Sequence, residues 1–242
     1  MARIGIIGSA GRMGQALQAA IAAAGHDCAG GIDKGGDAAA LAVQSDVLVD
    51  FSAPAALEGN LEAALAAGVP VVVGTTGLEE RHHWLIDAAA QTIPVLQTGN
   101  TSLGVTLLAH LVREAAQRLG SDWDIEIVET HHRMKVDAPS GTALLLGQAA
   151  ASGRNEVLDD VAQHGRDGIT GARPTGAIGF ASLRGGSVAG DHAVHFLADN
   201  ERLTFSHLAE NRDIFARGAI RAAQWLLGRE AGRYTMPQVL DL

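Results

Sequence analysis

Residues 3–25, RIGIIGSAGRMGQALQAAIAAAG, join three patterns without a gap. After Arg3, the residues up to Gly8 are apolar and rich in isoleucine, which is typical of a buried strand. Three glycines then recur at every third position, 8, 11 and 14. The remainder is an alanine- and leucine-rich run that ends in Gly25, the pattern of a helix and its stop signal. The stretch therefore predicts a strand, a tight glycine turn and a helix, as at the start of a Rossmann-like domain.

The same alternation continues to about residue 100. Helix patterns are expected at 56–68 and 78–91. Valine- and isoleucine-rich runs are expected as buried parallel strands at 28–33, 46–52, 69–77 and 93–100. Alternating strands and helices are typical of a parallel sheet covered by helices on both faces. We therefore predict an α/β fold with a Rossmann-like, doubly wound parallel sheet.

The glycine turn has the features of a dinucleotide-binding loop. Positions without side chains let the backbone approach a pyrophosphate, and the next helix offers free N–H groups and a positive dipole end. The candidate contacts are Gly8, Ser9, Ala10, Gly11, Arg12 and Met13. A tight turn without a ligand is the alternative that the spacing alone leaves open.

An acidic residue follows where a ribose contact is expected. Asp33 comes about twenty residues after the last glycine, and Lys34 follows it. A carboxylate favours the 2′-hydroxyl of NAD, whereas a cation suits the 2′-phosphate of NADP. The pair predicts that either NADH or NADPH is accepted.

Two later strand ends carry small, hydrogen-bonding residues. Ligands on open parallel sheets bind beyond the carboxyl ends of the strands, which makes these residues candidates for cofactor contact. They are Gly74, Thr75, Thr76, Thr98, Gly99, Asn100 and Thr101. Ordinary turns are the alternative interpretation.

The pattern changes after about residue 101. A long helix is expected at 103–120, and an alternating, half-exposed strand at 124–130. Later strands are expected at 177–186, 187–198 and 201–210, as antiparallel neighbours joined by turns at Gly185-Gly186 and Asp199-Asn200. We predict a dinucleotide-binding domain at 1–101 and 213–242, the latter with a helix at 213–228. Residues 102–212 are predicted to form a second α+β domain with a mixed or antiparallel sheet.

Proton carriers and cations are concentrated in ETHHRMKVDAPSGTA, residues 129–143, before an apolar helix pattern. His131 can exchange protons near neutral pH, and Lys135 can act as an acid or hold an anion. The expected N-terminus of the helix, a position suited to a carboxylate, holds Ser140, Gly141 and Thr142. The combination suits an acidic substrate that accepts a hydride and then a proton. A capped helix beside solvated charges is the alternative.

The remaining histidines carry no such support. His131 and His132 would point to opposite faces of a strand, and no metal-binding motif occurs elsewhere, so no metal is expected. Four others have no constellation around them in the sequence: His110, His192, His195 and His207.

Composition excludes several classes of protein. The chain has 242 residues, of which 47% are hydrophobic and 19% charged, and a formal net charge of −9. This is a globular balance, and the negative charge argues against a nucleic-acid partner. The single cysteine, Cys28, fits a reducing cytoplasm. No membrane span or signal peptide is expected, because no apolar run is long enough.

The motifs together resemble the 4-hydroxy-tetrahydrodipicolinate reductase (dihydrodipicolinate reductase) family. The resemblance rests on GSAGRMG at 8–14, VDFS at 49–52, VVGTTG at 72–77, the block at 129–143, and GRDGITGARPTGAIGFASLRGG at 165–186. It covers most of the chain in order, and the HHRxKxDAPSGTA block is its most specific part.

The resemblance implies a cytoplasmic homotetramer that reduces a cyclic dicarboxylate with NADH or NADPH in the diaminopimelate route to lysine. It implies His131 as proton donor and acceptor and Lys135 as a second proton donor. His132, with Gly141 and Thr142, would hold the substrate carboxylates. It also implies that residues 102–212 bind the substrate and form the oligomer.

Two alternatives have other consequences. Another dehydrogenase of similar layout, of amino-acid or homoserine type, would share the glycine turn but should lack the His-His-Arg-x-Lys block. A non-catalytic protein that senses NAD(P)H would need a partner surface rather than a proton relay. The intact block counts against both.

Overall fold

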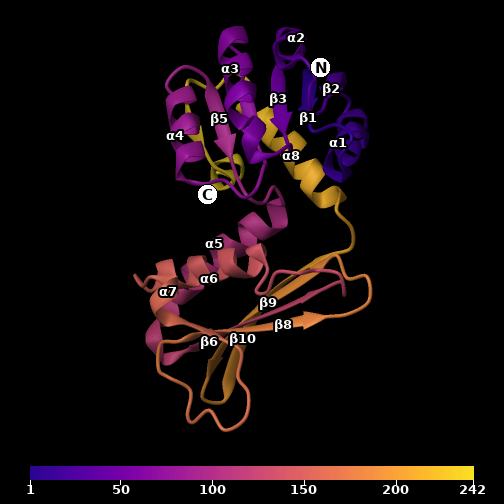
Figure 1. The fold of residues 1–242 in the computed structure, drawn as a ribbon. Coiled ribbons are helices and arrows are strands. Elements are labelled where there is room, and N and C mark those ends of the chain that lie inside the picture. Colours follow the sequence, from indigo (N-terminus) through magenta and orange to yellow (C-terminus); the bar gives the residue numbers. More distant parts are fainter. The chain divides into compact units, whose positions relative to one another are not determined.

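The computed structural model describes residues 1–242 and divides them into two units (Figure 1). Unit 1 consists of Met1–Leu103 and Arg212–Leu242, and unit 2 is the continuous segment Gly104–Asn211. None of the helices has the length and apolar character required to cross a membrane.

Unit 1 is built on a parallel sheet, as the sequence predicted, and the sheet has six strands. Its strands lie in the order β11-β5-β4-β3-β1-β2. They are β1 (Arg3–Ile7), β2 (Asp27–Ile32), β3 (Val47–Asp50), β4 (Val71–Val73), β5 (Pro94–Gln97) and β11 (Gly232–Tyr234). The chain leaves β1 toward β2 on one side and continues with β3 on the other. Ligands of such sheets bind beyond the carboxyl ends of the strands at this point.

Helices cover both faces of this sheet, and its central strands β1, β3 and β4 are almost entirely buried. Apolar side chains on one face pack against α1 (Arg12–Ala23), α8 (Asp213–Leu226) and α9 (Met236–Val239). Those on the other face pack against α2 (Ala38–Gln44), α3 (Leu57–Ala67) and α4 (Glu80–Ala89). A short 3-10 turn, Pro54–Ala56, precedes α3.

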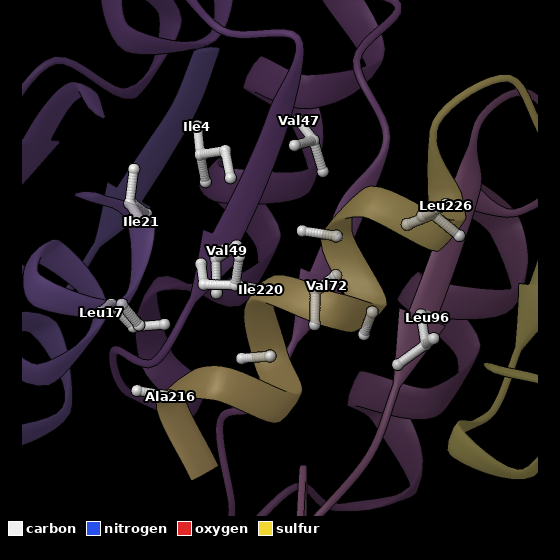
Figure 2. Close-up of a cluster of buried hydrophobic side chains, with 14 of the residues drawn as sticks. Ile4, Leu17, Ile21, Val47, Val49, Val72, Leu96, Ala216, Ile220 and Leu226 are labelled. Atoms are coloured by element: carbon white, nitrogen blue, oxygen red, sulfur yellow. The ribbon is translucent and has the colours of Figure 1, made fainter. Parts of the chain in front are cut away.

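Helix α8 brings the end of the chain back to the first half. In Figure 2 it crosses the sheet, and its residues Ala216, Ile220 and Leu226 lie among side chains of the strands. The approach is close, since a Cβ atom on Gly218 would lie 1.7 Å from the carbonyl oxygen of Thr101. The packing of α8 therefore depends on a glycine at this position.

Unit 2 contains a mixed five-stranded sheet in the order β10-β9-β6-β8-β7. Its strands are β6 (Asp124–His131), β7 (Ala162–His164), β8 (Ile178–Arg184), β9 (Gly190–Ala198) and β10 (Glu201–Ala209). Three helices pack on one face: α5 (Leu103–Leu119), α6 (Gly141–Gly153) and α7 (Leu158–Val161). A 3-10 turn, Gly120–Asp122, separates α5 from β6.

One expected strand pairing is wrong. β8 and β9 are not neighbours, because β6 lies between them and pairs with β8 in parallel and with β9 antiparallel. The turn at Gly185-Gly186 instead passes over the end of β6, where Gly185 N–H donates to the carbonyl oxygen of His131 (2.9 Å). The turn at Asp199-Asn200 does join neighbours, β9 and β10, and Asn200 has a φ of 63°.

The inner face of the unit 2 sheet changes from apolar to polar along β6. Alternate residues of β6 are buried, namely Ile125, Ile127, Glu129 and His131. The two isoleucines belong to the hydrophobic core beneath the helices. Glu129 and His131 continue the same face, so the core ends in a buried row of ionisable side chains.

Candidate active site

The glycine turn of unit 1 contains two glycines that the fold itself requires. Gly8 has a φ of +89°, and a Cβ atom there would lie 2.5 Å from the carbonyl oxygen of Phe51. A Cβ atom on Gly14 would lie 2.4 Å from the carbonyl oxygen of Gly8. These two glycines are explained by the tight connection between β1 and α1 without any ligand.

Gly11 is different. It is the N-cap of α1 and supplies no side-chain hydrogen bond to the first turn of the helix. A Cβ atom at Gly11 would meet only the carbonyl oxygen of Gly8, at 3.4 Å, which is an ordinary contact. Packing does not require this glycine, but it keeps the N-terminus of α1 open. The turn therefore fits the pyrophosphate of a dinucleotide, with Arg12 exposed beside it.

Asp33 lies against the same turn. Its carboxylate accepts hydrogen bonds from Ser9 Oγ (2.8 Å) and from the N–H of Ala10 (2.9 Å). The end of β2 and the glycine turn are thus joined through one carboxylate, and the exposed Lys34 follows. Asp33 thus lies beside the glycine turn, the position expected of a ribose-binding acid, and its contact with a ribose stays a prediction.

A buried carboxylate that the sequence reasoning missed organises the neighbouring strand ends. Asp50, at the end of β3, accepts from the Ser52 hydroxyl (2.6 Å), Asn60 Nδ2 (2.9 Å) and the Thr75 hydroxyl (3.1 Å). Gly74 is required there, since its Cβ would lie 2.3 Å from the Phe51 ring. The sequence could have indicated Asp50, because it is an acidic residue at the end of an apolar strand pattern, VLVD at 47–50.

The threonines after β4 and β5 differ in whether their hydroxyls bond within unit 1. The buried Thr101 donates its hydroxyl hydrogen to the carbonyl oxygen of Phe215 in α8 (2.7 Å), and Thr98 donates to the carbonyl oxygen of Asn100 (2.8 Å). Thr76 and Gly99 are exposed. The hydroxyls of Thr75 and Thr101 therefore already have partners inside unit 1, and a cofactor contact by these seven residues stays a prediction.

In unit 2, His131 is held by a buried carboxylate. Its Nδ1 lies 2.5 Å from Oε2 of Glu129, which is only 1% exposed. Arg184 donates to both oxygens of Glu129, each at 2.8 Å, and the N–H of Ser140 donates to Oε1 (3.3 Å). The buried carboxylate is therefore fully partnered, as a charge in the interior must be.

These contacts keep Glu129 ionised. Burial alone would raise the pKa of Glu129, but hydrogen bonds from Arg184, His131 and Ser182 outweigh it and lower the pKa to about 2. An ionised carboxylate only accepts hydrogen bonds, so Nδ1 of His131 must carry a hydrogen. Nε2 is then the nitrogen that gains and loses a proton.

A glycine lies beside Nε2 of His131. Gly190 has a φ of +155°, and a Cβ atom there would lie 2.9 Å from Nε2. A side chain at position 190 would therefore crowd the proton-exchanging nitrogen. A glycine in this position fits a histidine that must meet a reactant.

The N-terminus of α6 begins beside this histidine. Ser140 is its N-cap, and Ser140 Oγ accepts from the N–H of Ala143 (3.1 Å). A Cβ atom on Gly141 would meet nothing within 4 Å, so the first turn is open to a ligand. Because Ser140 also bonds Glu129, the structure brings His131 and the expected carboxylate-binding turn together.

Lys135 and His132 belong to the loop between β6 and α6. The Lys135 ammonium donates to Oδ1 of Asp137 (2.8 Å), and this hydrogen bond lowers the pKa of that carboxyl. His132 is held through its backbone, whose N–H donates to the carbonyl oxygen of Val188 (2.8 Å). Both lie near His131 in the chain, but their side chains are not part of the Glu129 network.

The expectation that His192 has no functional groups around it is wrong. His192 pairs with Glu129 in the β6–β9 register, and its ring lies 5.1 Å from the ring of His131. Its Nε2 lies 2.9 Å from Ser140 Oγ. Glu129 could have been found from its alternation with His131, whereas Arg184 and His192 depend on strand register, which the sequence does not reveal.

No group of three metal-ligating side chains comes together to hold an ion. The absence of a metal remains an expectation. The polar groups at the site are a carboxylate, imidazoles, a guanidinium and backbone N–H groups, and each contact described above is accounted for by hydrogen bonding.

Comparison with known proteins agrees over the whole chain. Two family models, the N-terminal and C-terminal parts of dihydrodipicolinate reductase, match residues 2–101 and 104–240. The 4-hydroxy-tetrahydrodipicolinate reductase of Zymomonas mobilis is 57% identical over 99% of this chain and 97% of its own. That of Bradyrhizobium diazoefficiens is 48% identical with the same coverage.

Solved structures show the same fold. Dipicolinate-bound dihydrodipicolinate reductase from Paenisporosarcina sp. TG-14 superposes with a TM-score of 0.74 at 20% identity, over 97% of both chains. A probable dehydrogenase from Thermotoga maritima gives 0.61 at 11% identity, over 98% of this chain and 92% of its own.

The Rossmann-like sheet, the open glycine turn and the carboxylate-bound histidine fit the class that the relatives establish, an oxidoreductase. The matches to known proteins decide against both alternatives, another dehydrogenase of similar layout and a non-catalytic NAD(P)H-sensing protein. The chain belongs to the dihydrodipicolinate reductase family.

Proposed function

We propose that this chain catalyses the reduction of 4-hydroxy-tetrahydrodipicolinate to tetrahydrodipicolinate in the diaminopimelate route to lysine, with His131 as the proton donor. The observation that carries the proposal is the 2.5 Å contact between Nδ1 of His131 and the ionised Glu129. The contact assigns proton exchange to Nε2, next to which Gly190 has no side chain.

The substrate ring holds a conjugated imine once the 4-hydroxyl has left as water. The nicotinamide of NADH or NADPH, when bound, supplies a hydride to carbon 4 of this ring. His131 delivers the proton that the resulting enamine takes up, and Glu129 stabilises the positive charge of the imidazole before that transfer. Hydride and proton together add the two hydrogens of the reduction. Lys135 is assigned as a second proton donor.

The cofactor is assigned to unit 1. The pyrophosphate would lie on the turn from Gly8 to Met13, and the ribose on Asp33 with Lys34 beside it. Supporting this, Gly11 is open without a packing reason, and Asp33 is joined to the turn. Residues 74–76 and 98–101 would contact the remaining part of the cofactor.

The substrate carboxylates are assigned to unit 2. The N–H groups of Gly141 and Thr142 at the start of α6, together with His132, would hold them. Glu129 carries a negative charge near this position, but Arg184 donates to both of its oxygens and balances it. An anionic substrate is therefore not repelled.

The assembly is proposed to be a cytoplasmic homotetramer formed by unit 2. Helices cover only the inner face of the unit 2 sheet, and Leu183 and Leu208 of the outer face are exposed. β10 is also an edge strand of nine residues. Exposed apolar sheet faces and long edge strands are typical interaction surfaces.

A coupled assay tests the activity. A synthase generates the substrate from pyruvate and aspartate semialdehyde, and loss of NAD(P)H absorbance is followed after this protein is added. No oxidation beyond the synthase-only control would refute the function. Replacing His131 by Gln should lower kcat much more than cofactor affinity, and a loss of cofactor affinity alone would contradict its assigned role.

A further inference from the structure

His192 is a buried ionisable residue that the proton transfer does not use. It lies on β9, 5% exposed, and pairs in register with Glu129 of β6 and His207 of β10. Its ring stands edge-on to that of His131, with 5.1 Å between centroids and 76° between planes. It therefore lies directly beside the proton donor.

Ser140 links this histidine to the start of α6. Its N–H donates to Glu129 Oε1 (3.3 Å), and its Oγ accepts from the N–H of Ala143 (3.1 Å). The hydroxyl hydrogen of Ser140 remains for Nε2 of His192, 2.9 Å away. Ser140 is thus held at three points, and one of them is His192.

The ring of His192 must be neutral to accept this hydrogen. Burial, followed by the charge of His131, lowers the pKa of His192 to about 4. Glu129 from β6 favours the charged form, whereas His207 from β10 and Lys135 from the loop before α6 oppose it. At neutral pH the Nε2 lone pair is therefore available to Ser140.

Packing alone does not explain a histidine at this position. Nδ1 of His192 is buried without a hydrogen-bond partner. A phenylalanine ring would fill similar space without leaving a buried polar atom unsatisfied, which costs stability. What only the imidazole provides is the acceptor at Nε2.

We propose that His192 is a positioning residue for the carboxylate-binding turn: through Ser140 it fixes the first turn of α6 relative to His131. The inference rests on the proposed function, in which Gly141 and Thr142 hold a substrate carboxylate. Glu129 and His192 hold the N–H and the hydroxyl of the same serine, so the proton donor and the carboxylate site share one support.

The test uses the full-length protein with saturating cofactor and dipicolinate as a non-reacting dicarboxylate, measured by calorimetry. His192→Phe should weaken dipicolinate binding about ten-fold, since it removes one hydrogen bond from Ser140. The KM of the substrate should rise similarly, while the dissociation constant of the cofactor stays unchanged. His192→Asn, whose amide oxygen can accept from Ser140, should restore most of the affinity.

A double-mutant cycle shows whether His192 acts through Ser140. In a Ser140→Ala background, His192→Phe should cause little further loss, because the shared hydrogen bond is already gone. Additive losses would overturn the proposal. So would an active His192→Phe variant that binds dipicolinate as tightly as the unmodified protein.

Two controls separate this result from other failures. His164→Phe replaces an exposed histidine that stacks on Phe180, and it should change neither dipicolinate nor cofactor binding. If His192→Phe fails to fold, His192→Asn and Ser140→Ala still decide the question. A protein that oxidises no cofactor refutes the proposed function itself; an active protein with an unaffected Phe variant refutes only the role of His192.

Discussion

Glu129 and His131 lie two residues apart on the same face of β6, and Nδ1 of the histidine is 2.5 Å from Oε2 of the glutamate. Replacing Glu129 by Gln keeps the shape but removes the charge. The amide can then donate to Nδ1 and favour the tautomer with hydrogen on Nε2. We expect kcat to fall roughly 100-fold, the range of general acid–base catalysis, with cofactor affinity unchanged in a fluorescence titration.

The matched control for this change is Glu126→Gln. Glu126 lies on the other face of the same strand and pairs with Arg166 and Arg173. The Glu126→Gln variant should lower the free energy of unfolding, because it weakens these ion pairs, while kcat stays nearly unchanged. An equal fall of kcat in both variants would show that the loss at position 129 is not specific to His131.

Gly11→Ala tests whether the glycine turn is open for a ligand. The new methyl group meets the protein only at an ordinary contact distance, but alanine is a poorer N-cap than glycine. The melting temperature should therefore fall by only about 2–4 °C. Cofactor affinity should fall about ten-fold or more, because the methyl group occupies the approach to the N-terminus of α1. Gly59→Ala, in α3 with open space around it, should bind the cofactor normally. Unchanged affinity in Gly11→Ala would place the pyrophosphate elsewhere.

Lys34→Ala tests cofactor selection. The side chain is exposed and follows Asp33, which is itself held by Ser9 and Ala10. Loss of the cation should raise the KM for NADPH about ten-fold and leave that for NADH nearly unchanged, because only NADPH carries the 2′-phosphate. Steady-state kinetics with both cofactors measures this. Equal losses would contradict a phosphate contact.

The stability of the protein should depend on pH through His192. Its pKa falls from 6.5 to about 4 on folding, so between these values the unfolded chain binds a proton that the folded chain does not. The contribution of neutral His192 to the free energy of unfolding is therefore complete above pH 6.5 and is lost as the pH falls toward 4. It amounts to roughly 3 kcal/mol at most. Urea unfolding from pH 7 to 4 should show a smaller decline for His192→Asn. Glu129 affects stability at lower pH. Its pKa falls from 4.5 to about 2 on folding, so its contribution to the free energy of unfolding is lost as the pH falls below 4.5.

Most of the fold follows from periodicity in the sequence. The runs at 46–52 and 69–77 contain the buried strands β3 and β4, and the run at 213–228 contains α8. The elements that were not predicted are short, such as α2 and β11. β11, with the sequence GRY, contains no apolar run such as those that mark β3 and β4, and the seven residues of α2 are too few to show a clear helical repeat.

The sequence indicated those groups of the candidate site that are contiguous in the chain. His131 and the turn at Ser140–Thr142 lie within one motif, and the structure joins them through Glu129. Arg184 and His192 reach the same carboxylate or serine from two other strands, and those strands proved not to be neighbours. No local pattern records that β6 is inserted between β8 and β9.

The return of α8 to the first sheet constrains the order in which the chain can fold as it is synthesised. Residues 104–211 are continuous and can form their own core as soon as they have left the ribosome. The first 103 residues cannot, because Ala216, Ile220 and Leu226 complete one side of their sheet. That apolar surface stays uncovered until α8 has been synthesised, so residues 1–103 are the part that needs protection from aggregation during translation.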